Sequence, residues 1–121
     1  MLNKLTSALK EVLEIKKHER VLIVTDAKMQ NITKKFYTAA KRLSNNVDTL
    51  KIKVTGRHGK EPTKAEAARM LGYDVLILLT TYSLTHTDAR RNACKQGARV
   101  ASMPGFSLKM LKALAVNYKE M

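Results

Sequence analysis

The chain has 121 residues, 45% of them hydrophobic, and its 23 Lys and Arg residues against 10 Asp and Glu residues give a formal net charge of +13. This length suits one compact domain over residues 1–121 and leaves no room for a second. The single cysteine excludes an internal disulfide, and no apolar run approaches the ~20 residues that cross a bilayer. Without a signal-peptide pattern at its start, the sequence predicts a cytoplasmic protein.

The first half of the chain shows the periodicities of helices and strands in turn. Apolar residues recur at three- and four-residue intervals over residues 2–17, which predicts an amphipathic helix, with His18 stabilising its carboxyl terminus. The continuous run 21–24 (VLIV) is typical of a central parallel strand buried on both faces. A second helical stripe covers residues 32–43, and the alternating residues 47–54 predict an edge strand.

The middle of the chain begins with a loop over residues 55–63, which has two glycines, a proline and no periodicity. Thr63 is predicted to cap a short helix, with Glu66 completing a capping box. The apolar run 75–79 predicts another buried strand, and a helix is expected to begin near Thr85.

A last strand is predicted to end at residues 103–105, and Ser107 is expected to open a final helix. Strands that alternate with helices at short spacing predict a parallel sheet covered on both faces. The predicted fold class is therefore α/β, a three-layer sandwich with a four-stranded sheet of order 2-1-3-4 and flavodoxin- or Rossmann-like winding.

Several short motifs follow one another in the second half of the chain. They read Ser83-Leu84-Thr85-His86-Thr87, Ala89-Arg90-Arg91, Gly97-Ala98-Arg99-Val100 and Met103-Pro104-Gly105. Together with the segment 19–26 (ERVLIVTD), they resemble in order and spacing the N-terminal domain of the thermophilic metallo-aminopeptidase family, the aminopeptidase T or leucyl aminopeptidase group.

The resemblance implies a non-catalytic N-terminal domain that packs against a catalytic domain or second subunit, shapes the substrate cleft and supports dimerisation. In that family the two-metal site lies in a second domain. The resemblance thus implies that divalent zinc or cobalt would bind only with that catalytic domain, and that this chain alone has no peptidase activity and no cofactor.

In the predicted topology, the loops that leave the first and third strands splay apart and form a crevice. We expect a ligand-facing or interface rim there, made of Asp26, Ser83, Thr85, His86, Thr87, Arg90, Met103, Pro104 and Gly105. The amide groups that open the helix after Thr85 would attract an anion or a carboxylate. In the alternative, Thr85 or Thr87 only caps that helix and His86 hydrogen-bonds a neighbouring loop.

Basic residues cluster in the same loops and predict a positive rim along this edge. The possible anion-binding residues are Lys28, Arg57, His58, Lys60 and Arg91. The chain could on this basis be a free-standing basic module for nucleic acid or a phosphorylated small molecule; alternatively, the rim faces an acidic domain or only solvent. Nucleic acid is not favoured, because the few aromatic residues are scattered and form no stacking platform.

Known catalytic and metal-binding patterns are absent from the sequence. The three histidines lie on separate predicted elements, and the Asp residues belong to different loops or helix ends, so we expect no metal site and no catalytic residue. Cys94 is predicted to lie in mid-helix and to pack against the sheet as a small core residue. A small enzyme built on the turn 83–87 has the least support, because no paired base accompanies it.

Overall fold

The computed structural model of the protein describes residues 2–106. The helix predicted to open at Ser107 lies outside these residues. The described elements are α1 (Leu2–Leu13), β1 (Arg20–Thr25), the short 3-10 helix η1 (Ala27–Met29), α2 (Gln30–Lys41), β2 (Asn46–Lys51), α3 (Lys64–Arg69), β3 (Val75–Leu79), α4 (Asp88–Lys95) and β4 (Arg99–Ser102).

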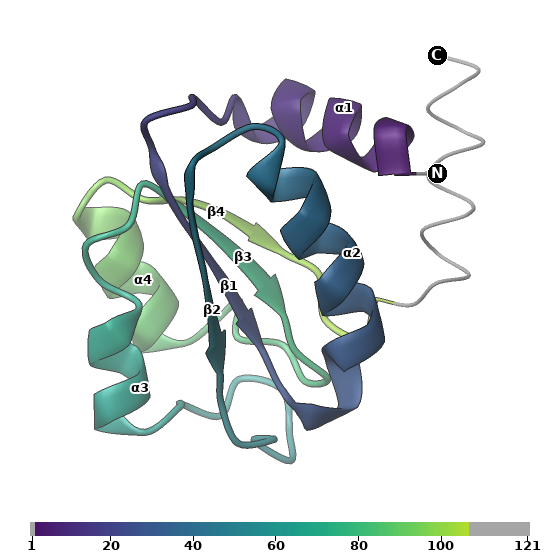
Figure 1. Ribbon diagram of the computed structural model, residues 1–121. Helices are drawn as coiled ribbons and strands as arrows, with labels where there is room; N and C mark the ends of the chain where they lie inside the picture. Colours follow the sequence, from purple (N-terminus) through teal and green to yellow (C-terminus); the bar gives the residue numbers. More distant parts are fainter. Residues whose placement is uncertain (1, 107–121) are drawn as a thin grey trace.

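The four strands form one parallel sheet in the order β2-β1-β3-β4, which confirms the predicted topology (Figure 1). In the register, Val21 of β1 lies opposite both Val47 of β2 and Val75 of β3. The chain moves outward from β1 to β2 and then returns across β1 to β3. The loops that leave β1 and β3 therefore meet at the topological switch point, at the carboxyl edge of the sheet.

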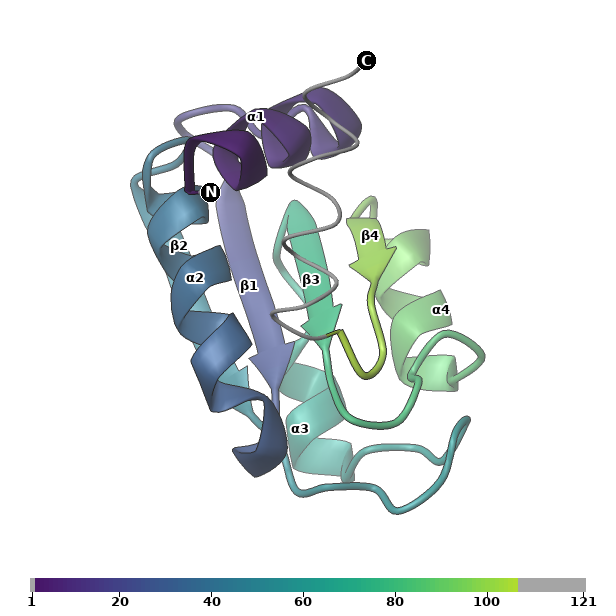
Figure 2. The same ribbon diagram turned by 90° about the vertical axis from the view of Figure 1, so that its right-hand side faces the viewer.

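The helices cover the sheet in two layers, α1 and α2 on one face and α3 and α4 on the other (Figures 1 and 2). Alternate side chains of β1 enter the two cores: Val21 and Ile23 pack on the α1 and α2 side, and Leu22 and Val24 pack on the other side. All four are 0% exposed. The continuous apolar run in β1 is thus explained by burial on both faces.

The first helix is shorter than predicted, because α1 ends at Leu13. Glu14 adopts φ 51°, a left-handed conformation that cannot continue a right-handed helix. The guanidinium of Arg99 donates from Nε to the Leu13 carbonyl oxygen at 2.9 Å and so caps the end of α1. The predicted role of His18 is therefore wrong: it lies in the turn before β1, where its carbonyl oxygen accepts a hydrogen bond from Asn46 Nδ2 at 3.2 Å.

The predicted core position of Cys94 is also wrong. The helix α4 begins at Asp88 rather than near Thr85 and ends at Lys95, so Cys94 lies in its last turn, where it is half-buried. Ala89 and Ala93 are the buried residues of α4 instead. The thiol of Cys94 accepts a weak hydrogen bond from Arg90 Nη1 at 3.6 Å.

The predicted capping box before α3 is confirmed. Thr63 Oγ1 accepts a hydrogen bond from the Glu66 amide at 3.2 Å, and Glu66 Oε1 accepts one from the Thr63 amide at 2.8 Å. The predicted strand 47–54 is too long, because β2 ends at Lys51. The Lys53 amide therefore lies outside the strand, and it donates a hydrogen bond to the second carboxylate oxygen of Glu66. Among the described helices, none combines the length and apolarity needed to cross a membrane.

Candidate functional site

Asp26 joins the loops that leave β1 and β3. Its carboxylate accepts hydrogen bonds from the Thr81 amide at 2.7 Å, from Thr81 Oγ1 at 2.9 Å and from the Lys28 amide at 3.1 Å. Asp26 is 1% exposed and is the N-cap of η1. Its position as the first residue after a buried strand explains this role, since the side chain meets the amides of both loops. The carboxylate of Asp26 is therefore bonded to groups of its own chain in both loops.

A chain of hydroxyl groups links the loop after β3 to β4. Ser83 Oγ donates to Thr85 Oγ1 at 2.8 Å, and Thr85 Oγ1 lies 2.7 Å from Ser102 Oγ. Ser83 Oγ also accepts a hydrogen bond from the Thr85 amide at 3.0 Å. These hydroxyls bond to one another and not to a carboxylate or an imidazole, so the arrangement contains no activated nucleophile.

The loop between β2 and α3 is held against the loop after β3. His58 Nδ1 accepts a hydrogen bond from the Ser83 amide at 2.8 Å, and the Gly59 amide donates to the Ser83 carbonyl oxygen at 2.9 Å. The His58 ring also contacts the Tyr82 ring edge-on at 5.4 Å between centroids. The structure thus gives His58 the loop-binding role that one sequence interpretation assigned to His86, whose side chain is exposed.

The amino end of α4 already holds a carboxylate, that of Glu61. Its two oxygens accept hydrogen bonds from the Asp88 amide at 2.7 Å and the Ala89 amide at 3.2 Å. Thr87 is the N-cap, and its Oγ1 accepts a hydrogen bond from the Arg90 amide at 3.2 Å. The positive helix end therefore attracts an anion as expected, but the anion belongs to the chain itself.

We expect Glu61→Ala to lower the free energy of unfolding by about 1 kcal/mol, because two amides of α4 lose their acceptor and the helix dipole loses its counter-charge. Urea unfolding followed by circular dichroism measures the change. Glu61→Gln is the matched control, since its amide oxygen remains an acceptor, and it should lose less. Equal stability of Glu61→Ala and the unmodified protein would contradict a capping role.

The remaining rim residues are divided between the two sides of this edge. Arg90 Nε donates to the Thr85 carbonyl oxygen at 2.7 Å, and Arg91 pairs with Asp88 and the His86 carbonyl oxygen. Pro104 and Gly105 are exposed, and the Gly105 amide donates to the Thr80 carbonyl oxygen at 2.9 Å. Met103 is half-buried and packs against the core beneath α1 and α2, away from the hydroxyl chain.

The five predicted anion-binding residues are all exposed and come from loops or helix ends near this edge, namely Lys28, Arg57, His58, Lys60 and Arg91. The side chains of Lys28, Arg57 and Lys60 have no hydrogen bond or ion pair within residues 2–106. Within the described residues, these three cations are thus exposed and unpaired.

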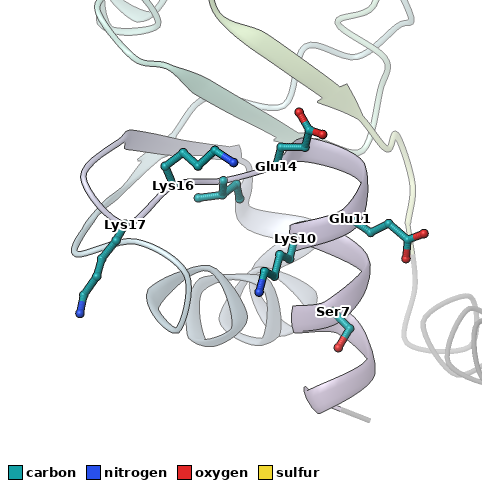
Figure 3. Close-up of a pocket in the computed structure, with 7 residues that line it drawn as sticks. Ser7, Lys10, Glu11, Glu14, Lys16 and Lys17 are labelled. Atoms are coloured by element: carbon teal, nitrogen blue, oxygen red, sulfur yellow. The ribbon is translucent and has the colours of Figure 1, made fainter.

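A surface depression of about 660 Å³ lies elsewhere, along α1 and the turn that follows it (Figure 3). It is lined by Ser7, Lys10, Glu11, Glu14, Ile15, Lys16 and Lys17. Figure 3 shows Glu11 and Lys17 pointing away from each other, so these two charged groups do not converge on one ligand. In the part of the chain that the structure describes, no three His, Cys, Asp or Glu side chains are grouped to hold a metal ion.

Comparisons of the chain with models of known protein families, with curated proteins and with solved structures give no match.

Proposed function

We propose that this chain is a non-catalytic α/β domain whose carboxyl edge packs against a catalytic domain or a second subunit, as its resemblance to metallo-aminopeptidases implies. One observation carries the proposal: Asp26, Glu61 and the Ser83 hydroxyl, the groups best suited to chemistry, already hydrogen-bond to this chain's own amides. A general base or nucleophile must instead reach its substrate directly or through water. Asp26, Glu61 and the Ser83 hydroxyl instead hold the loops at the carboxyl edge of the sheet in their conformation.

The charge of the domain indicates the character of its partner. A formal charge of +13, with Lys28, Arg57 and Lys60 exposed and unpaired near one edge, attracts an acidic surface over long range. A partner whose contact surface carries an excess of carboxylates would suit this edge. In the proposed arrangement, exposed His86 and Pro104 form part of the wall of the substrate cleft, and the partner holds the zinc or cobalt.

The purified chain is expected to show no turnover of a leucyl chromogenic peptide with added zinc or cobalt. The reason is that residues 2–106 contain no grouped metal ligands and no free acid–base pair at the candidate site. Absorbance of the released chromophore measures the rate, and a mock purification from cells without the gene controls for host peptidases. Metal-dependent turnover above that background would overturn the non-catalytic proposal.

The unpaired cations support a second candidate function, a basic module for nucleic acid or a phosphorylated small molecule. Fluorescence anisotropy with a labelled single-stranded RNA at low and high salt separates the two candidates. Tight binding that falls steeply with salt, and that Arg57→Glu with Lys60→Glu abolishes, would favour the second candidate. Lys34→Glu with Lys35→Glu, on the exposed side of α2, is the charge-matched control. No binding at low salt would remove the second candidate.

A further inference from the structure

An apolar groove opens on the face of the sheet that carries α1 and α2. Its volume is about 190 Å³, and the residues that line it come from α1, from α2 and from the chain in and after β4. Its walls include Leu9, Val12, Phe36, Ala101, Met103 and Phe106, and every residue that lines it is apolar. Val12 is 75% exposed, so apolar surface continues from the groove onto the outside of α1.

The position of the groove follows from the unequal cover of the sheet. The strand β3 is fully buried, whereas all four residues of β4 are only half-buried. The other face of this half of the sheet packs on α4, through the buried residues Ala89 and Ala93. Parallel sheets are normally covered on both faces, so the groove marks a place where a covering segment is expected.

We propose that residues 107–121 of this same chain fill the groove as an amphipathic helix. The described chain reaches Phe106, which is itself a wall of the groove and contacts Phe36 edge-on at 5.6 Å between ring centroids. The described part of the chain therefore reaches its last residue at the groove. In the sequence that follows, apolar residues recur at helical spacing, namely Leu108, Leu111, Leu114, Ala115 and Tyr118.

This inference goes beyond the proposed function, because it assigns the apolar surface to the chain itself and leaves only the polar carboxyl edge to a partner. The segment's own Ser107 is a favoured N-cap residue type, which suits a helix that begins directly after Phe106. A helix on this face is not a crossover to a strand beyond β4, since right-handed crossovers in that direction lie on the α3 and α4 face. It is a covering helix.

Two substitutions on opposite sides of the proposed helix test the idea with the full chain. Leu111→Asp places a charge on the apolar side and is expected to lower the thermal midpoint by roughly 5 °C or more. Ala113→Asp places the same charge about 200° away around the helix axis and is expected to change the midpoint little. Equal midpoints for the two variants would overturn the proposal.

A direct contact measurement distinguishes the occupants of the groove. In a sample labelled at methionine and leucine methyl groups, we expect a nuclear Overhauser effect between the Met103 methyl and the Leu111 methyls. In a mixture of separately labelled chains, that effect should vanish if the contact lies within one molecule. A contact that persists between molecules would assign the groove to a second copy, and no contact in either sample would leave it open; both results contradict the proposal.

Discussion

Replacing Asp26 by alanine is expected to lower the free energy of unfolding by about 3 kcal/mol. The substitution removes a 1% exposed carboxylate that accepts three hydrogen bonds, and it leaves the Thr81 amide and hydroxyl without that acceptor. Urea unfolding measures the loss. Hydrogen exchange should show the Thr81 amide losing protection at the same time, since its bond to Asp26 joins β1 to β3.

The direction of this change separates a structural role from a ligand-binding role. Carboxylates kept for function often destabilise the fold, so their removal raises stability. Asp88→Asn, at an exposed residue whose ion pair lies on the surface, is the matched control and should change stability by well under about 1 kcal/mol. Unchanged or increased stability of Asp26→Ala would show that Asp26 is held for a ligand.

The second large effect is expected at acid pH and involves Glu19 and Arg99. The pKa of Glu19 is lowered from 4.5 to about 2, chiefly because its carboxylate accepts hydrogen bonds from Arg99 at 2.6 and 3.0 Å. Burial of the carboxylate acts in the opposite direction and raises the pKa, whereas a hydrogen bond from the Lys16 amide lowers it further. Because the folded state binds this proton less readily than the unfolded state, the stabilisation is complete above pH 4.5. It is lost as the pH falls from 4.5 to about 2.

Replacing Arg99 by methionine is expected to lower stability at pH 7 by about 2 kcal/mol, of which about 1 kcal/mol is the ion pair after allowance for solvent screening. The screening is substantial because the Arg99 side chain is 40% exposed. The rest comes from the carbonyl oxygen of Leu13, which loses its cap. Stability measured between pH 7 and pH 2 should fall less steeply in this variant.

Arg91→Met is the control for the pH experiment, because Arg91 also pairs with a carboxylate but on the exposed surface of α4. This substitution should leave unchanged the fall in the free energy of unfolding between pH 4.5 and about 2. If the free energy of unfolding of Arg99→Met fell between pH 4.5 and about 2 as steeply as that of the unmodified protein, the low pKa of Glu19 could not be assigned to its ion pair with Arg99.

The fold was predictable because its signals are local. The continuous run in β1 and the Thr63 capping box each lie within a few residues, and both formed as expected. The predicted edge strand also formed as β2, but it ends at Lys51 and not at residue 54. The strand order followed from the alternation of strands and helices together with the handedness of crossovers. None of these inferences required knowledge of how a loop is shaped.

The candidate site was less predictable because its bonds join distant residues. Asp26 and Thr81 are 55 residues apart, and Glu61 reaches the Ala89 amide across 28 residues. The spacing of apolar and polar residues along the sequence does not indicate which distant residues form hydrogen bonds with each other. The only sequence signal for Glu61 is that it is the single acidic residue in the loop 55–63, close to the basic residues that were predicted to bind anions.

The end of α1 shows how a local pattern can mislead. Ile15 continues the apolar spacing of the helix and is indeed buried, but it lies beyond the left-handed residue Glu14. The group that caps the helix there is Arg99, 86 residues away in the sequence. The helical spacing of apolar residues correctly indicated that Ile15 is buried, but it did not indicate the residue at which the helix ends.

The bonds of Asp26, His58 and Glu61 fasten three loops to one another while the domain folds. The conformational entropy of those loops is therefore lost during folding and does not have to be lost again when another molecule arrives. The proposed partner at the carboxyl edge would therefore meet loops that are already ordered, and its association would resemble the docking of two preformed bodies rather than the ordering of loops on contact.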